Sequence, residues 1–284
     1  MISKIILPRL VAPAIVRRLG NRSRWAARRI LSLLRNPTAV GQRAVDHIGS
    51  AVSHLLPNST LARFHRRRTF QMVYRNNLWG TDGKSQFFSG LGSHGEPAAA
   101  YVDAIVPIIL AHLNDCGRQA TILDLGCGDF SVGAQLLQRL PPLRYLGCDV
   151  VPEIIEHNRK QYGGSRVQFQ TLDIVCEDLP DGDICLVREV FQHLSNRDIA
   201  CVLPKLRKFR YVYVTEGQPL VRVGKPNPDK PANAEVRFDW RTGYGRGVEL
   251  DESPWNLSIE EVSCVSSLVH NKEFIITHRV RFPS

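Results

Sequence analysis

The fold of this chain is constrained most by one ten-residue segment, I-L-D-L-G-C-G-D-F-S, at residues 122–131. Apolar residues around one acid predict a buried parallel strand, and two glycines follow it directly. Apolar residues then recur at helical spacing at Val132, Leu136, Leu137 and Leu140. Glycine is needed where the backbone must approach a ligand closely or adopt a conformation that a Cβ forbids. The segment therefore predicts a strand, a ligand-facing turn and a helix.

The charges at this turn distinguish between two kinds of ligand. A dinucleotide fingerprint has three glycines, whereas this chain has Gly126 and Gly128 with Ser131 in the third place. Asp124 and Asp129 bracket the glycines, and two carboxylates repel a pyrophosphate but attract an ammonium or a sulfonium group. The motif D-L-G-C-G-D resembles the first motif of class I S-adenosylmethionine-dependent methyltransferases. The alternative without a ligand is a glycine turn that closes an ordinary strand–helix unit.

The rest of the chain alternates between predicted strands and helices. Strands are predicted at residues 145–150, 167–170, 183–187 and 211–215, and helices at 97–114, 152–162 and 195–208. A last strand at 274–280 is expected to form a hairpin with residues 262–268. This order predicts an α/β, Rossmann-like seven-stranded methyltransferase sheet with helices on both faces.

The resemblance implies a set of residues that bind S-adenosylmethionine. Asp149 ends the second strand, 23 residues beyond Gly126, where an acid accepts hydrogen bonds from a ribose diol. Asp173 lies where the family holds the adenine amino group, with Ile174 flanking the ring. The full set of predicted cofactor-binding residues is Asp124, Gly126, Cys127, Gly128, Asp129, Asp149, Val150, Asp173, Ile174 and Arg188.

Glu189 and His193 are the predicted catalytic residues. Both follow the fourth strand, and a helical backbone would place residues four apart on one face. Either one could serve a hydroxyl acceptor as general base, and His94 is a further candidate. The alternative is that Glu189 pairs with Arg188 or Arg197 while His193 only packs. The resembled family leads us to expect Asp at position 189, so the catalytic role of Glu189 is a hypothesis.

The sequence limits the acceptor without identifying it. No Asn/Asp-Pro-Pro-Tyr/Phe motif is present, which disfavours adenine and glutamine nitrogen acceptors. Transfer to oxygen on a small molecule or glycan is therefore the first hypothesis. Ser93 and His94, in a Gly/Ser-rich loop, and Trp240, in the Pro/Gly-rich stretch 216–250, are the predicted substrate residues. The alternatives are an RNA methyltransferase and a non-catalytic binding module with the same fold.

The beginning of the chain has a different composition. Residues 1–75 carry fifteen Lys or Arg and one acid, whereas the remainder has a net charge of −4. Apolar residues at helical spacing near residues 27–34 and 45–55 predict basic amphipathic helices. We therefore divide the chain into an extension, residues 1–78, and a methyltransferase domain, residues 79–284. Through residues 1–75 the extension could bind an anionic membrane surface or RNA. Alternatively, it could be a helical appendage that packs on the catalytic domain with its arginines in solvent.

The seven cysteines predict neither a metal site nor disulfides. They are scattered, and no Cys-x-x-Cys pair or Cys/His metal spacing occurs. We expect reduced cysteines, no metal and a cytoplasmic protein, peripheral to the membrane if the basic extension binds lipid. No run of about 18 apolar residues occurs, so no membrane-spanning helix is expected. We also expect the extension to be dispensable for binding the cofactor.

Overall fold

The computed structural model of the 284-residue chain describes residues 56–116, 120–236, 245–267 and 273–282. These segments belong to one unit, Val52–Ser284. Its centre is a seven-stranded sheet in the order β3-β2-β1-β4-β5-β7-β6. The strands are β1 (Thr121–Leu125), β2 (Arg144–Asp149), β3 (Val167–Thr171), β4 (Ile184–Arg188), β5 (Tyr211–Pro219), β6 (Ser258–Ser267) and β7 (Glu273–Arg281). The first five strands pair in parallel and β7 is antiparallel to both its neighbours.

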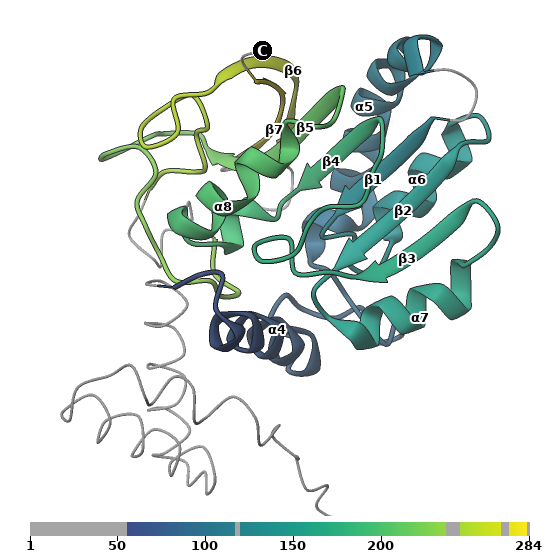
Figure 1. Cartoon of the computed structure of the whole chain (residues 1–284), viewed down its shortest axis with the longest axis horizontal. Helices are drawn as coiled ribbons and strands as arrows, with labels where there is room; N and C mark the ends of the chain where they lie inside the picture. Colours follow the sequence, from purple (N-terminus) through teal and green to yellow (C-terminus); the bar gives the residue numbers. More distant parts are fainter. Residues whose placement is uncertain (1–55, 117–119, 237–244, 268–272, 283–284) are drawn as a thin grey trace, which may run out of the picture. The chain divides into compact units, whose positions relative to one another are not determined.

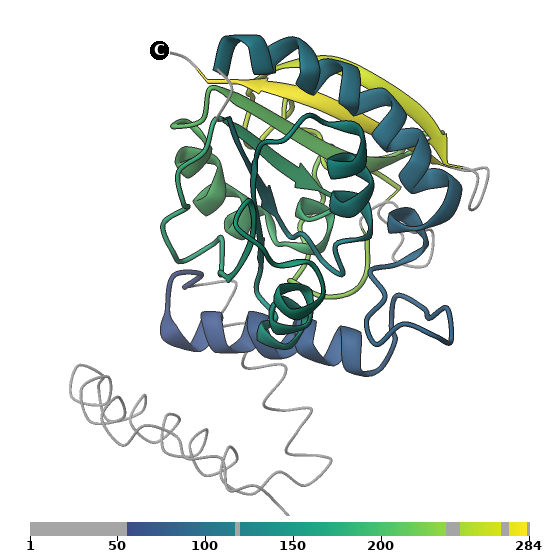
Figure 2. The ribbon, with the colours of Figure 1, turned by 90° about the vertical axis from the view of Figure 1, so that its right-hand side faces the viewer.

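Helices cover both faces of the sheet (Figures 1 and 2). The α-helices are α4 (Thr60–Arg75), α5 (Gly95–Cys116), α6 (Ser131–Arg139), α7 (Pro152–Tyr162) and α8 (Asn196–Leu206), and two short 3₁₀ helices are η1 (Leu91–Ser93) and η2 (Phe191–His193). Each central strand is almost wholly buried, as a parallel strand covered on both sides must be. The predicted fold class is confirmed, including the terminal β6–β7 hairpin.

Two details of the predicted helices are explained by local chemistry. α8 begins with a reciprocal capping box, in which Ser195 and Asp198 each accept from the other's backbone N–H.

α5 has the length and apolar composition of a membrane span over Gly95–Leu113, and no other helix in the described part of the chain has both. Ile105 and Ile109 of α5 have no exposed surface, because they pack in the core. α5 is therefore a core helix of this unit.

The helix α4 packs on the unit through a buried ionic cluster. The Arg66 guanidinium lies 3.0 Å from the Asp173 carboxylate and 3.0 Å from that of Asp198, and all three side chains are at most 2% exposed. Arg66 also donates to the backbone oxygen of Pro57 at 2.8 Å. Burial alone would lower the pKa of Arg66, but the two carboxylates outweigh burial and raise it. The predicted boundary after residue 78 therefore falls inside the unit, because α4 is part of it.

Figure 1 shows where α4 lies with respect to the sheet. The arrows of β1, β2 and β3 point towards the edge along which α4 runs, and Figure 2 shows the same edge from the side. Asp173, which binds Arg66, follows the end of β3. A chain that started at Asn76 would lose Arg66 and leave Asp173 and Asp198 without their buried cation. Removal of all of residues 1–75 should therefore destabilise the unit, so the prediction of a dispensable extension does not extend to α4.

Replacing Arg66 should lower the unfolding free energy of the protein much more than replacing a surface arginine of the same helix. Arg66→Met leaves two buried carboxylates unpaired, which costs about 3–5 kcal/mol of unfolding free energy. Arg63→Met is the matched control, because its pair with Glu177 is 41% and 29% exposed and should cost at most about 1 kcal/mol. Urea unfolding measures both. Equal losses in the two variants would contradict a structural role for the Arg66 cluster.

Candidate functional site

The glycine turn after β1 is fixed by the neighbouring strand. Gly126 and Cys127 donate their backbone N–H groups to the Cys148 carbonyl at 2.7 and 3.0 Å. Gly126 and Gly128 have φ of 77° and 52°, in the left-handed region that glycine adopts without strain. A Cβ on Gly126 would lie 2.3 Å from Cγ2 of Val190, and one on Gly128 would lie 2.3 Å from Oγ of Ser89. The turn therefore needs glycine at both positions, for conformation and for space.

Phe130 stands where the first motif of the resembled methyltransferase family commonly has a third glycine, and it adopts a glycine-like conformation. Its φ is 68°, which is unusual for an aromatic residue. Its ring packs against Tyr145, Tyr162 and Phe169, with ring centroids 4.9 to 5.3 Å apart. Aromatic packing thus offsets a backbone conformation that costs about 1–3 kcal/mol. The departure from the family motif leaves the turn intact.

Two buried carboxylates lie at the ends of β1 and β2. Asp149 accepts from the backbone N–H of Gly128 at 3.2 Å and of Val151 at 3.0 Å. Asp124 accepts from the hydroxyl of Tyr145. Burial is the main cause that raises the pKa of both carboxyls to about 6. Buried carboxylates that titrate near neutrality are typical of functional sites, and hydroxyl donors of a ligand would compensate Asp149 for its lost water.

A loop from the region before β1 lies over the glycine turn, and we call residues 87–94 the cover loop. Ser89 donates its backbone N–H to the Asp129 carboxylate at 2.8 Å, and Asp129 donates its own to Oγ of Ser89 at 2.8 Å. The hydroxyl of Tyr74, in α4, lies 3.1 Å from the same Oγ. The cover loop and α4 thus reach the turn together. Tyr74 and Ser89 are site residues that the sequence analysis missed, because neither belongs to the glycine motif.

His94 is held within the cover loop by an acid and an aromatic ring. Its Nε2 lies 2.8 Å from Oδ2 of Asp129 and its Nδ1 lies 3.4 Å from Oγ of Ser131. The ring stacks on Phe88 at 4.2 Å with an interplanar angle of 6°. Burial would raise the pKa of Asp129, but the hydrogen bond and charge of His94 outweigh it and lower that pKa. The Asp129 carboxylate therefore orients the His94 ring, and Nδ1 of that ring makes only a long contact, with Ser131.

Arg188 and Glu189 face the cover loop from the end of β4. Arg188 donates to the Gly92 carbonyl at 2.5 Å and to Oγ of Ser93 at 3.3 Å, and lies 4.8 Å from the ring centroid of Tyr101. It also lies 3.2 Å from Oε2 of Glu189. The pairing of Glu189 with Arg188 that the sequence left open is therefore present. Ser93 is thus one of the cover-loop residues that Arg188 holds by hydrogen bonds.

The prediction that Glu189 and His193 lie on one face of a helix is wrong. Glu189 has φ of 53°, and helical geometry begins only with η2, so the two residues do not share a helical face. Their roles in catalysis nevertheless stay predictions.

His193 is only 8% exposed, and the centroid of its ring lies 4.8 Å from that of Trp79. Burial is the main cause that lowers the pKa of His193 to about 3, and the charge of Lys230 adds to it. A base that weak is largely unprotonated and accepts protons poorly at neutral pH.

The remaining predicted residues are placed in different surroundings. Asp173 accepts from Arg66 through both carboxylate oxygens and from the backbone N–H of Val175 at 3.0 Å. These bonds occupy the lone pairs that an adenine amino group would need, so the geometry disfavours the adenine role. Ile174 is buried and Val150 is half-buried beside the site. Trp240 lies outside the described residues.

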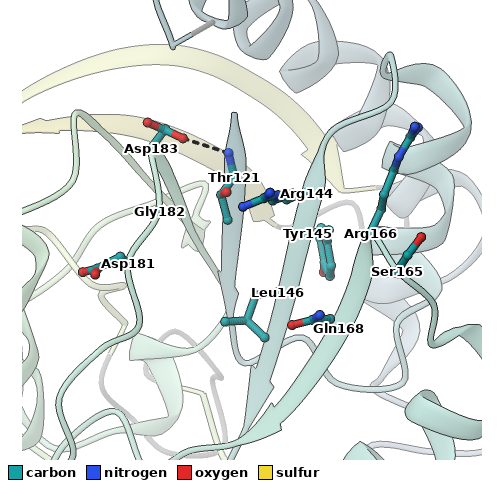
Figure 3. A pocket seen from close by; sticks show the side chains of 10 residues that line it. All are labelled: Thr121, Arg144, Tyr145, Leu146, Ser165, Arg166, Gln168, Asp181, Gly182 and Asp183. Carbon is teal, nitrogen blue, oxygen red and sulfur yellow. Dashed lines mark hydrogen bonds between the residues drawn. The ribbon is translucent and has the colours of Figure 1, made fainter. Parts of the chain in front are cut away.

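The described residues hold no metal-binding cluster, and their surface cavity lies away from the glycine turn. No group of three or more His, Cys, Asp or Glu side chains that could hold a metal occurs among them. A surface cavity of about 630 Å³ opens at the amino ends of the parallel strands, between Arg144, Arg166 and Asp183 (Figure 3). Ligands of open α/β sheets bind at the opposite, carboxyl edge. The cavity is therefore separate from the site around the glycine turn.

Of the seven cysteines, the six whose side chains are described are free.

The low pKa of His193 predicts a stability that depends on pH. Between pH 6.5 and 3 the unfolded ring binds a proton that the folded ring does not, so this contribution to stability is lost as the pH falls through that window. At pH 5 the loss is on the order of 2 kcal/mol relative to pH 7. We expect the difference in unfolding free energy between the native chain and His193→Gln to narrow by that amount. An unchanged difference at the two pH values, measured in urea, would contradict the burial of a neutral ring.

Comparison with known proteins gives the family of this domain. Residues 123–209 match the model of a methyltransferase domain. Malonyl-[acyl-carrier protein] O-methyltransferase of Acetivibrio thermocellus is 38% identical over 83 residues, and juvenile hormone acid O-methyltransferase of Bombyx mori is 30% identical over 97 residues. These alignments cover 29% and 32% of this chain and the same shares of the two relatives. The chain thus matches less than a third of the length of either.

The chain is also similar to a solved structure, the N-methyltransferase NodS of Bradyrhizobium japonicum in complex with S-adenosyl-L-homocysteine. The identity is 14%, the TM-score is 0.48, and the match covers 75% of this chain and 99% of that one. Residues 123–209 therefore belong to a methyltransferase domain, and these similarities support its assignment to the class I S-adenosylmethionine-dependent methyltransferases.

Proposed function

We propose that this protein is an enzyme that transfers a methyl group from S-adenosylmethionine to oxygen on a small molecule or glycan. The observation that carries the proposal is the left-handed Gly126–Gly128 turn beside the buried Asp149 carboxylate, at the carboxyl edge of a methyltransferase sheet. Both curated relatives are named as O-methyltransferases, which supports oxygen as the acceptor atom. An RNA acceptor and a non-catalytic module are the alternatives.

The residues at the carboxyl edge fit the parts of this cofactor. Asp149 would accept hydrogen bonds from the ribose hydroxyls, because its carboxylate is buried and binds only backbone N–H groups. Asp124 and Asp129 would favour the cationic methionine end. When bound, S-adenosylmethionine supplies an electrophilic methyl group. The chain's own contribution is to orient the acceptor in line with that group and to exclude water.

The geometry favours His94 over His193 as the base that takes a proton from a hydroxyl acceptor. A carboxylate that accepts from Nε2–H fixes the tautomer in which Nδ1 carries the lone pair, as in other acid–histidine pairs. The His94 side chain is 25% exposed, so an acceptor can reach it, whereas His193 is buried and a very weak base. Glu189 is the second candidate, because its side chain is 18% exposed at the end of β4.

Removing the Asp149 carboxylate should weaken cofactor binding. Asp149→Ala loses the acceptor for two ribose hydroxyls, and each charged hydrogen bond contributes about 1.5–3 kcal/mol. We therefore expect at least tenfold weaker binding of S-adenosylmethionine in calorimetry. Asp103→Ala is the control, because that acid lies on α5 in an exposed pair with Arg139. Thermal unfolding of both variants separates lost affinity from lost folding, and native affinity in folded Asp149→Ala would refute the ribose assignment.

Replacing His94 should slow methyl transfer while leaving cofactor binding intact. An acceptor would first be found by incubating cell extracts with cofactor carrying a radiolabelled methyl group. His94→Gln should then lower turnover by about 10²–10⁴-fold, the usual contribution of a general base. His112→Gln, on α5, is the control. If Glu189→Gln loses activity and His94→Gln does not, Glu189 is the base. If no extract yields a labelled product although the cofactor binds, the non-catalytic module is favoured.

A further inference from the structure

The outward face of α4 is apolar although no described residue covers it. Its inner face contributes Ala62, Phe70, Val73 and Tyr74 to the interior of the unit. On the opposite side, Leu61, Phe64 and Met72 are 49%, 54% and 36% exposed. A surface helix normally has one apolar stripe, and a second one indicates a further partner.

These outward residues follow one line along the helix. We call the set Leu61, Phe64, Arg68, Met72 and Arg75 the outer stripe. Its spacing of three or four residues places all five members on the side opposite the buried ones. Leu56 and Leu78, at the two ends of the helix, are 61% and 58% exposed. Five of the eleven exposed large apolar side chains in the described residues thus lie within residues 56–78, which is more than the scattered single residues of an ordinary surface.

The charge of this face is entirely positive. No Asp or Glu occurs between Asp46 and Asp82 in the sequence. The ion pairs of α4 within the described part of the chain are made by Arg63, with Glu177, and by the buried Arg66. Arg68 is half-buried and Arg75 exposed, so both guanidinium groups can meet an anionic partner beside the apolar residues.

We propose that the outer stripe of α4 docks on an anionic lipid surface. Large apolar residues with arginines between them match the boundary between acyl chains and charged headgroups. RNA would pair with the arginines but would gain little from Leu61 and Met72, so the apolar residues favour lipid. Since the inner face of α4 holds Tyr74 over the glycine turn, this docking brings the carboxyl edge of the sheet to the membrane. The proposal does not depend on methyl transfer.

Photo-crosslinking in the full chain tests this contact directly. Phe64 is replaced by p-benzoylphenylalanine, a tolerated change because the side chain is 54% exposed. The protein is irradiated with vesicles of phosphatidylglycerol and phosphatidylcholine, and adducts are identified by mass spectrometry. The same replacement at Leu110, which is 40% exposed on α5, is the control. We expect lipid adducts at position 64, at least tenfold above those at position 110, and few with pure phosphatidylcholine.

Charge variants provide a second readout. Arg68→Gln and Arg75→Gln together should lower the adduct yield at position 64 and the affinity for anionic vesicles, by about fivefold for each arginine. Arg144→Gln with Arg166→Gln, two exposed arginines at the amino edge of the sheet, should change neither. Vesicle binding without lipid adducts at position 64 would overturn the proposal. So would adducts of position 64 with residues 1–51, with a second copy of the chain or with added RNA.

Discussion

The left-handed glycine turn after β1 is the constraint on which the rest of this site depends. Its backbone is fixed to β2 through the Cys148 carbonyl, and its two glycines leave room for Val190 and Ser89. A side chain at either glycine would push away the segment after β4 or the cover loop. Because both segments carry candidate catalytic residues, the turn determines where those residues can lie. Phe130 then extends the left-handed path into α6, stabilised by an aromatic cluster.

The helix α4 connects the site to the surface of the protein. Its inner face supplies Arg66 to Asp173 and Tyr74 to Ser89, so the helix is fixed at two points of the carboxyl edge, after β3 and over the turn after β1. Its outer stripe carries no such partner among the described residues. Loss of Arg66 from the buried ionic cluster would be costly, because it would leave the Asp173 and Asp198 carboxylates unpaired in the interior. α4 thus joins the residues around the glycine turn to an exposed apolar and basic surface.

The titratable groups near the site differ because their solvation differs. Asp124 and Asp149 lose water on burial, and neither has a cation as close as Arg66 is to Asp173. Their pKa values therefore rise to about 6. His193 loses water as well, and because its charged form is the cation, its pKa falls to about 3. His94 keeps partial exposure and an acid partner. Burial and partner, rather than residue type, separate the two histidines as candidate bases.

The sequence by itself determined the sheet, the glycine turn and the position of Asp149, because strand and helix periods and glycine conformations are local properties. The resemblance to the methyltransferase family rested on the same local motif. Only the tertiary structure decided that α4 belongs to the unit, that Arg66 occupies Asp173 and that Asp129 orients His94. Arg66 and Asp173 lie 107 positions apart, and His94 and Asp129 lie 35 apart. Such pairs, like the burial that sets the pKa of His193, depend on how distant segments pack, and no local pattern in the chain encodes that directly.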